Sequence, residues 1–167
     1  MLLGILSHTG QSFSALLYYA ITYALTVLGA FGVVSIVEKE TGGDTLSDFA
    51  GLSRRAPVPS FCMLIFLLSL AGIPPLAGFF GKFYLFSAVL TSTRGSLGLL
   101  WFVILAIAMS AVSLYYYLKV LKYIYVTDPP ANTVPIRVSG LRQIVLCLIA
   151  LSVTLLGCVP NLLLSWL

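Results

Sequence analysis

Lys82 is the only charged residue in an apolar stretch that extends over residues 60–90. Two consecutive prolines, Pro74 and Pro75, interrupt this stretch shortly before the lysine. Because proline lacks a backbone N–H donor and clashes with the preceding helical turn, we expect the helix to break at this pair. An ionisable side chain beside a broken helix at membrane depth is typical of sites that bind or transfer ions and protons. Lys82 is therefore the first candidate for chemistry in this chain.

The length of the apolar stretch also predicts a break. Residues 59–91 form a run of 33 residues. A straight helix of that length would extend for roughly 50 Å, whereas the hydrocarbon core of a bilayer is about 30 Å thick. We therefore expect two shorter helices that meet near residues 73–75. The backbone groups freed at such a break need partners from the protein or from a water-filled cavity.

Two glycines, Gly78 and Gly81, precede Lys82 on the same predicted helix. They make the helix thin beside the lysine and leave room for water or a neighbouring helix. A charged lysine at the bilayer centre costs about 2.5–3.5 kcal/mol on insertion scales, so it needs a hydrated or protein-lined interior. Desolvation favours the neutral amine and a nearby carboxylate favours the ammonium form, so a balanced group can pass a proton on. We expect Lys82 to be a proton relay; the alternative is a structural lysine held by backbone carbonyls freed at the prolines.

The composition of the chain is that of a membrane protein. Of its 167 residues 60% are hydrophobic and 8% are charged, and the mean hydropathy is +1.08, which excludes a soluble domain. The formal net charge is +4, but the nine Lys and Arg residues lie mostly in loops between apolar segments. This distribution is a topology signal and does not indicate a nucleic-acid partner. We predict an all-α, polytopic transmembrane helix bundle in contact with the lipid bilayer.

Four apolar segments are long enough to span a membrane. They cover about residues 15–37, 59–91, 97–120 and 142–165, and the second is the broken one. In the first segment, Tyr18 and Tyr19 are expected at the membrane interface. Gly29 and Gly32, nearer its other end, predict close helix packing.

Two further regions leave alternatives open. The loop over residues 38–58 contains either a short surface helix, capped by Thr45 or Ser47, or a simple connector. The third span ends in three consecutive tyrosines, residues 115–117, which point in three directions on a helix. Lys119 follows them and is expected to extend toward the headgroups, or else to act as a secondary, buried relay.

Basic residues gather on one side of the expected bundle. Those on that side are Lys39, Arg54, Arg55, Lys119, Lys122, Arg137 and Arg142. Only Arg94 lies on the other side, and Lys82 lies within the membrane. The excess of positive charge predicts that the more basic side faces the cytoplasm or its equivalent.

The four spans contain no Asp or Glu. The chain also has no nucleotide-binding motif, no Cys or His cluster for a metal, and no Ser-His-Asp set. Cys62, Cys147 and Cys158 lie in apolar segments without metal spacing and are expected to be buried free thiols. We therefore expect no cofactor or metal on this chain, and any redox centre and energy source on other chains.

Four motifs surround the candidate residues and lie between residues 28 and 119. They are SLAGIPPLAGFFGKF at 69–83, LGAFGVV at 28–34, DFAGL at 48–52 and SLYYYLK at 113–119. The first resembles the broken helix of the antiporter-like membrane subunits of respiratory complex I. Together the four are most similar to subunit N of bacterial NADH-quinone oxidoreductase, whose relatives are mitochondrial subunit 2 and the plastid NdhB protein. The resemblance covers nearly the whole chain, from about residue 15.

This resemblance implies a role in proton translocation. Lys82 matches the lysine of the second discontinuous helix in the family, which is considered part of the exit side of a proton channel. The implied partners are other membrane subunits of complex I, and NADH, FMN, iron–sulfur clusters and quinone are implied on other subunits. The implied location is the inner (plasma) membrane of a bacterium or, alternatively, an organellar membrane.

The resemblance also defines what the chain lacks. The family fold has fourteen helices with two inverted repeats of five, and this chain matches the last four, which are the C-terminal portion. The first repeat, with its own broken helix and its glutamate–lysine pair, is not matched. The chain is thus expected to be a fragment or one polypeptide of a split subunit. A subunit of a multi-subunit cation/proton antiporter and an inactive structural fragment are the alternative interpretations.

Overall fold

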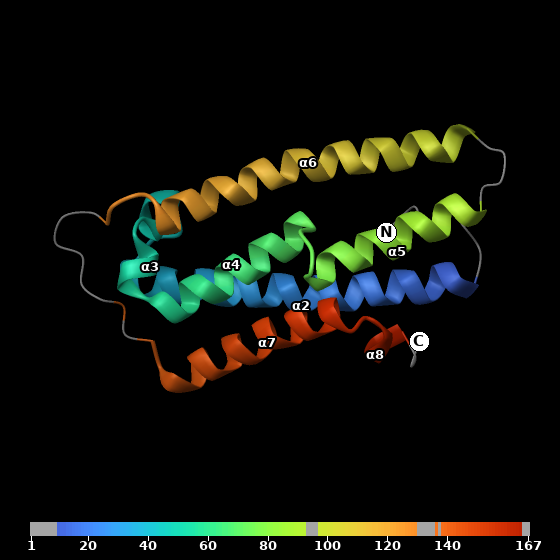
Figure 1. Cartoon of the computed structure of the whole chain (residues 1–167). Coiled ribbons are helices and arrows are strands. Elements are labelled where there is room, and N and C mark those ends of the chain that lie inside the picture. The colour runs from blue at the N-terminus through green and yellow to red at the C-terminus, as the bar shows by residue number, and fades with distance from the viewer. Residues whose placement is uncertain (1–9, 93–96, 130–135, 137, 165–167) are drawn as a thin grey trace.

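Four apolar segments fold into long helices in the computed structural model of the chain, which describes residues 10–92, 97–129, 136 and 138–164 (Figure 1). These helices are α2 (Gly10–Thr41), the pair α4 (Pro57–Ala71) and α5 (Ala77–Ser92), α6 (Leu97–Tyr125) and α7 (Gly140–Cys158). The shorter elements are η1 (Leu46–Phe49), α3 (Leu52–Arg55) and α8 (Asn161–Leu164). The described residues contain no strand, and the predicted all-α helix bundle is confirmed.

Three helices contain segments that are long and apolar enough to cross a membrane. These segments are Phe13–Thr41, Trp101–Tyr125 and Gly140–Cys158. Helices α2 and α6 are longer than the first and third predicted spans. Helix α2 already begins at Gly10, and α6 continues to Tyr125. The last helix is shorter than expected and ends at Cys158, because Pro160 disfavours the helical conformation of the residue before it.

The second apolar segment is broken where the prolines predict. Helix α4 ends at Ala71, and Gly72 adopts the left-handed conformation with a φ of 86°, which closes the helix. Pro74 and Pro75 follow in the gap, and α5 begins at Ala77. The two half-helices both pack along α2, which supports the break from one side (Figure 1).

Glycines on α2 allow neighbouring helices to approach closely. A Cβ atom at Gly29 would overlap the ring of Phe66, a fully buried side chain on α4. A Cβ atom at Gly32 would lie 3.1 Å from Cδ2 of Leu146 on α7. The predicted role of these two glycines in helix packing is therefore confirmed.

Tyr18 lies in the interior of the bundle, and the prediction that it is interfacial is wrong. Its side chain is 0% exposed, and its hydroxyl donates a hydrogen bond of 2.7 Å to the carbonyl oxygen of Leu156 on α7. Because α2 begins at Gly10, Tyr18 lies more than two helical turns from the start of the helix. The tyrosine therefore links α2 to α7.

Replacing Tyr18 with phenylalanine should lower the free energy of unfolding by about 0.5–1.5 kcal/mol, since the ring remains but the hydrogen bond to Leu156 is lost. Unfolding of the chain in detergent micelles measures this loss. Tyr116→Phe is the matched control, because the side chain of Tyr116 is 60% exposed. Equal losses in the two variants would contradict a specific contribution of this bond.

The predicted basic side corresponds to one end of the bundle. The end of α2, helix α3, the end of α6 and the start of α7 all lie at this end (Figure 1). Arg54 on α3 forms an ion pair of 2.7 Å with Asp128, which follows α6. The grouping is thus confirmed for the described basic residues, whereas Arg94 and Arg137 lie outside the described residues.

The loop after α2 contains a short helix and is more than a connector. Thr45 is the N-cap of η1, and its backbone N–H donates to Oδ2 of Asp48 at 2.9 Å. The predicted surface helix with Thr45 as its cap is therefore confirmed.

The three cysteines are free thiols, but only Cys62 is buried. The expectation of burial is wrong for Cys147 and Cys158, whose side chains are exposed on α7. The physical reason is that α7 buries a single face. The residues of that face are Leu146, Ala150, Val153 and Gly157.

Candidate functional site

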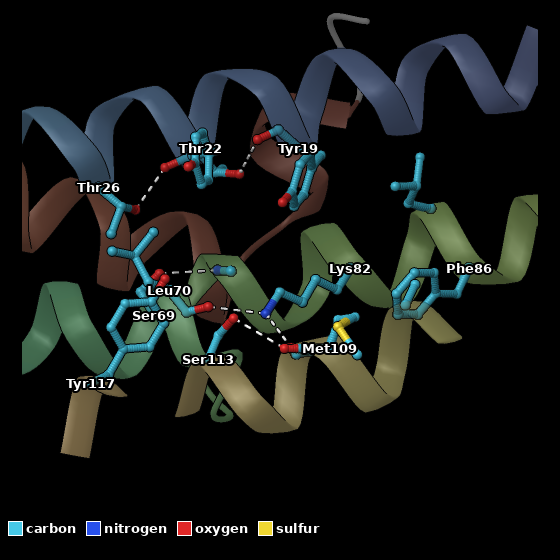
Figure 2. Close-up of a pocket in the computed structure, with 15 residues that line it drawn as sticks. Tyr19, Thr22, Thr26, Ser69, Leu70, Lys82, Phe86, Met109, Ser113 and Tyr117 are labelled. Carbon is cyan, nitrogen blue, oxygen red and sulfur yellow. Dashed lines mark hydrogen bonds between the residues drawn. The ribbon is translucent and has the colours of Figure 1, made fainter. Parts of the chain in front are cut away.

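The amine of Lys82 lies at the broken end of α4. The side chain extends from α5, and Nζ donates hydrogen bonds to the carbonyl oxygens of Leu70 at 2.9 Å and Ala71 at 3.3 Å. These carbonyls belong to the last turn of α4, where no further helical N–H can reach them. A third hydrogen bond, of 2.7 Å, joins Nζ to Oγ of Ser110 on α6. Lys82 thus connects both halves of the broken helix to α6 (Figure 2).

The two predicted glycines lie at close contacts beside Lys82. The N–H of Gly78 donates to Oγ of Ser69 on α4 at 3.1 Å, and a Cβ at Gly78 would overlap the carbonyl of Ser69. A Cβ at Gly81 would lie 3.1 Å from Cδ2 of Tyr19 on α2. Gly78 therefore lets the half-helices meet, and Gly81 lets α2 approach α5.

A cavity of about 320 Å³ adjoins the amine of Lys82 and is bounded by α2, α4, α5 and α6 (Figure 2). Many of the side chains that line it carry a hydroxyl group. These are Tyr19, Thr22, Tyr23, Thr26, Ser69, Ser110, Ser113 and Tyr117. Among the residues that the structure describes, no carboxylate lines this cavity. The walls can therefore hydrogen-bond water or a proton carrier, but they contain no anion to pair with the lysine.

Three of the smaller hydroxyl groups of this cavity are oriented by their own helices. Thr22 donates to the carbonyl of Tyr18 at 2.8 Å, and Thr26 donates to that of Thr22 at 2.7 Å. On α6, Ser113 donates to the carbonyl of Met109 at 3.0 Å. Because each hydroxyl hydrogen is used within the helix, the oxygen keeps lone pairs that can accept a hydrogen bond from the cavity.

Lys119 does not belong to this site. Its side chain is exposed on α6 and does not line the cavity. The three tyrosines before it do point in different directions, as predicted: Tyr117 lines the cavity, whereas Tyr115 and Tyr116 are 66% and 60% exposed. Neither the headgroup role nor the relay role of Lys119 follows from this placement, and both stay predictions.

Residues on α2 and α6 complete the site and were not anticipated as part of it. The signal that could have revealed them is the spacing of their hydroxyl groups by three or four residues, which places them on one helical face. On α2 these residues are Tyr19, Thr22 and Thr26, and on α6 they are Ser110, Ser113 and Tyr117.

Comparison with known proteins identifies the family. Residues 1–112 match the family model described as "NADH:quinone oxidoreductase/Mrp antiporter, TM". The chain belongs to this family. Among curated members of this oxidoreductase/antiporter family, it is 56% identical over its whole length to NADH-quinone oxidoreductase subunit N 2 of Acidobacterium capsulatum, of which it covers 33%. It is 42% identical over 96% of its length to subunit N of Desulforamulus reducens, of which it covers 32%. The predicted similarity to subunit N is confirmed.

A solved structure extends the comparison to three dimensions. The fold is similar to a chain of respiratory complex I from Thermus thermophilus, solved with bound aureothin, with a TM-score of 0.73 and 30% sequence identity. The match covers 91% of this chain and 34% of that one. The chain thus spans about a third of the length of the oxidoreductase/antiporter family members that it matches.

Proposed function

We propose that this chain forms the C-terminal portion of subunit N in a proton-translocating NADH-quinone oxidoreductase, and that Lys82 relays protons there. The observation that supports this most strongly is the position of the Lys82 amine. It lies at a helix break and is hydrogen-bonded to Ser110 at the edge of a hydroxyl-lined cavity. Such broken helices and intramembrane lysines are typical of ion and proton pathways.

The contacts of Lys82 also fit the structural alternative. Its bonds to the carbonyls of Leu70 and Ala71 are those expected of a lysine that only holds the break. A holding role needs no cavity and no further polar wall, however. The hydroxyl groups of Thr22, Thr26 and their neighbours face a cavity inside a membrane bundle, where apolar side chains would suffice for packing. This polar lining supports the relay.

The redox chemistry belongs to other subunits in this proposal. NADH, FMN, iron–sulfur clusters and quinone are bound elsewhere in the complex, and the chain contributes a non-redox, proton-translocating part of the enzyme. Its partners are other membrane subunits of complex I. The bacterial origin of the relatives supports a location in a bacterial plasma membrane.

A second candidate function is that of a subunit in a multi-subunit cation/proton antiporter without a redox partner. The description of the family includes this function, since it names both oxidoreductases and Mrp antiporters. Purification of the tagged chain from its native membrane distinguishes the two. We expect flavin- and iron–sulfur-containing subunits to copurify, with their absorbance in the eluate. Recovery of other membrane subunits alone would favour the antiporter.

Replacing Ser110 with alanine should slow proton translocation by the assembled enzyme at least about tenfold, since a hydrogen bond to a charged amine contributes about 1.5–3 kcal/mol to its placement. The rate of proton uptake into proteoliposomes measures this effect. Ser152→Ala is the matched control, because its hydroxyl bonds to the carbonyl of Leu148 on its own helix, α7, and does not line the cavity. A rate for Ser110→Ala equal to that of the control would contradict a role for this contact.

A further inference from the structure

A second cavity, of about 370 Å³, lies between α2 and α7 at the basic end of the bundle. Helices α2 and α7 pack against each other, with Gly32 close to Leu146, and in the view of Figure 1 the first turns of α7 diverge from α2 at the basic end. We call this cavity the α2–α7 groove. The residues that line it are Gly32, Ser35, Ile36, Lys39, Leu141, Arg142, Val145 and Leu146. It is separate from the cavity at Lys82, with which it shares no lining residue.

Two cations lie together at the mouth of the α2–α7 groove. Lys39 comes from the last turns of α2 and Arg142 from the first turn of α7, and both side chains are exposed. In the described part of the chain, the only ion pair joins Arg54 to Asp128, so neither cation has an ion-pair partner there. Glu38 and Glu40 flank Lys39 in sequence but are not among the groove-lining residues. No Asp or Glu lines the groove among the described residues. The mouth therefore attracts an anion.

The inner part of the groove is apolar. Ile36, Val145 and Leu146 line it, Ser35 contributes a hydroxyl group, and Gly32 lets α2 approach Leu146 closely. On α2 the apolar surface continues away from the cations through Leu28 and Phe31, which are 65% and 67% exposed. A cationic mouth that leads into an apolar track matches an amphiphile with a negative head and a hydrocarbon tail. It does not match a small hydrophilic anion, which would leave these walls uncovered.

We propose that the α2–α7 groove binds an anionic phospholipid. Its phosphate lies between Lys39 and Arg142, and an acyl chain follows the apolar wall of α2. The depth of the two cations in the membrane suits a lipid phosphate, because both cations lie at helix ends, where a spanning helix meets the headgroup layer. Basic pockets between membrane helices at the positively charged side recognise such headgroups. This inference does not depend on proton transfer through Lys82.

The test is native mass spectrometry of the full chain in detergent, titrated with phosphatidylglycerol or with phosphatidylcholine. We expect the chain to bind phosphatidylglycerol more tightly than phosphatidylcholine. The double variant Lys39→Gln/Arg142→Gln should bind it about 25-fold more weakly, at about fivefold for each cation near a membrane surface. Circular dichroism of each variant should show unchanged helix content. In the double variant Lys39→Gln/Arg142→Gln, the preference for phosphatidylglycerol over phosphatidylcholine should disappear.

The matched control is Arg54→Gln/Lys122→Gln, which removes the same charge from exposed positions on α3 and α6 outside the groove. We expect it to keep the affinity for phosphatidylglycerol. Ser35→Phe keeps both cations but fills the groove, which Ser35 lines, and it should also weaken lipid binding.

Three results would overturn the proposal. One is an equal loss of affinity in the two double variants, which would indicate general surface charge. The second is equal binding of the two lipids by the unchanged chain. The third is full competition by soluble glycerol 3-phosphate, which would indicate a site for a free phosphate and not for a lipid.

Discussion

Replacing Lys82 with alanine should reduce proton translocation by about 10²-fold or more, which is the usual contribution of a positioned acid–base group. Alanine has no titratable atom, and the described residues that line the cavity offer no carboxylate in its place. The carbonyls of Leu70 and Ala71 lose their donor, but the adjoining cavity has room for water to replace it. Proton uptake by proteoliposomes that contain the assembled enzyme measures the effect, with NADH as electron donor.

The control for this variant is Lys122→Ala. Lys122 is an exposed lysine on α6 at the basic end of the bundle, and it does not line the cavity. Its loss changes the net charge of the chain by the same amount and should leave translocation within about twofold of the unchanged enzyme. Full translocation in Lys82→Ala would rule out the relay.

Replacing Gly157 with alanine should destabilise the chain by about 3 kcal/mol or more, at the upper end of the cost of overpacking. A Cβ at Gly157 on α7 would overlap the carbonyl oxygen of Pro75 and would lie 2.6 Å from the backbone N of Ala77. These atoms are backbone atoms of the helix break and cannot rotate away. Helix α7 must therefore move off the break, or the break must shift. Gly78→Ala should act similarly, since its Cβ would overlap the backbone of Ser69.

The free energy of unfolding in detergent micelles measures this loss. Gly140→Ala is the matched control on the same helix, because no atom lies within 4 Å of a Cβ at that position. It should change stability by less than about 1 kcal/mol, as alanine favours the helix slightly over glycine. Equal stability of Gly157→Ala and Gly140→Ala would contradict the close contact between α7 and the break.

The helices and the break could be predicted because they depend on local sequence. A pair of prolines such as Pro74 and Pro75 interrupts a helix whatever the surrounding fold. The apolar run is also too long for one spanning helix, so an interruption was required. Gly29 could be assigned to packing because a small residue in a membrane helix usually marks close contact with another helix. The burial of Tyr18 could not, because an aromatic residue near a helix start suits an interface equally well. Only the position of α7 decides its environment, through the hydrogen bond to Leu156.

The site was predictable only in part. Lys82 is conspicuous as a charge in an apolar run, and the glycines beside it are visible in the sequence. Ser110 is 28 residues away on another helix, and nothing local indicates that its hydroxyl meets the amine. The position of such a partner depends on how α6 packs against α4 and α5, which is a property of the tertiary fold.

In the proposed function, Lys82 works by exchanging a proton and not merely by holding the break. Lys82→Arg separates the two roles, because arginine keeps the positive charge and the hydrogen-bond donors but does not lose its proton in proteins. The distance between spin labels at the exposed positions Phe61 on α4 and Phe83 on α5 reports whether the break is intact. The decisive measurement is the number of protons translocated per electron by this variant in proteoliposomes. The relay predicts a lowered ratio with an unchanged label distance, whereas an unchanged ratio would contradict it.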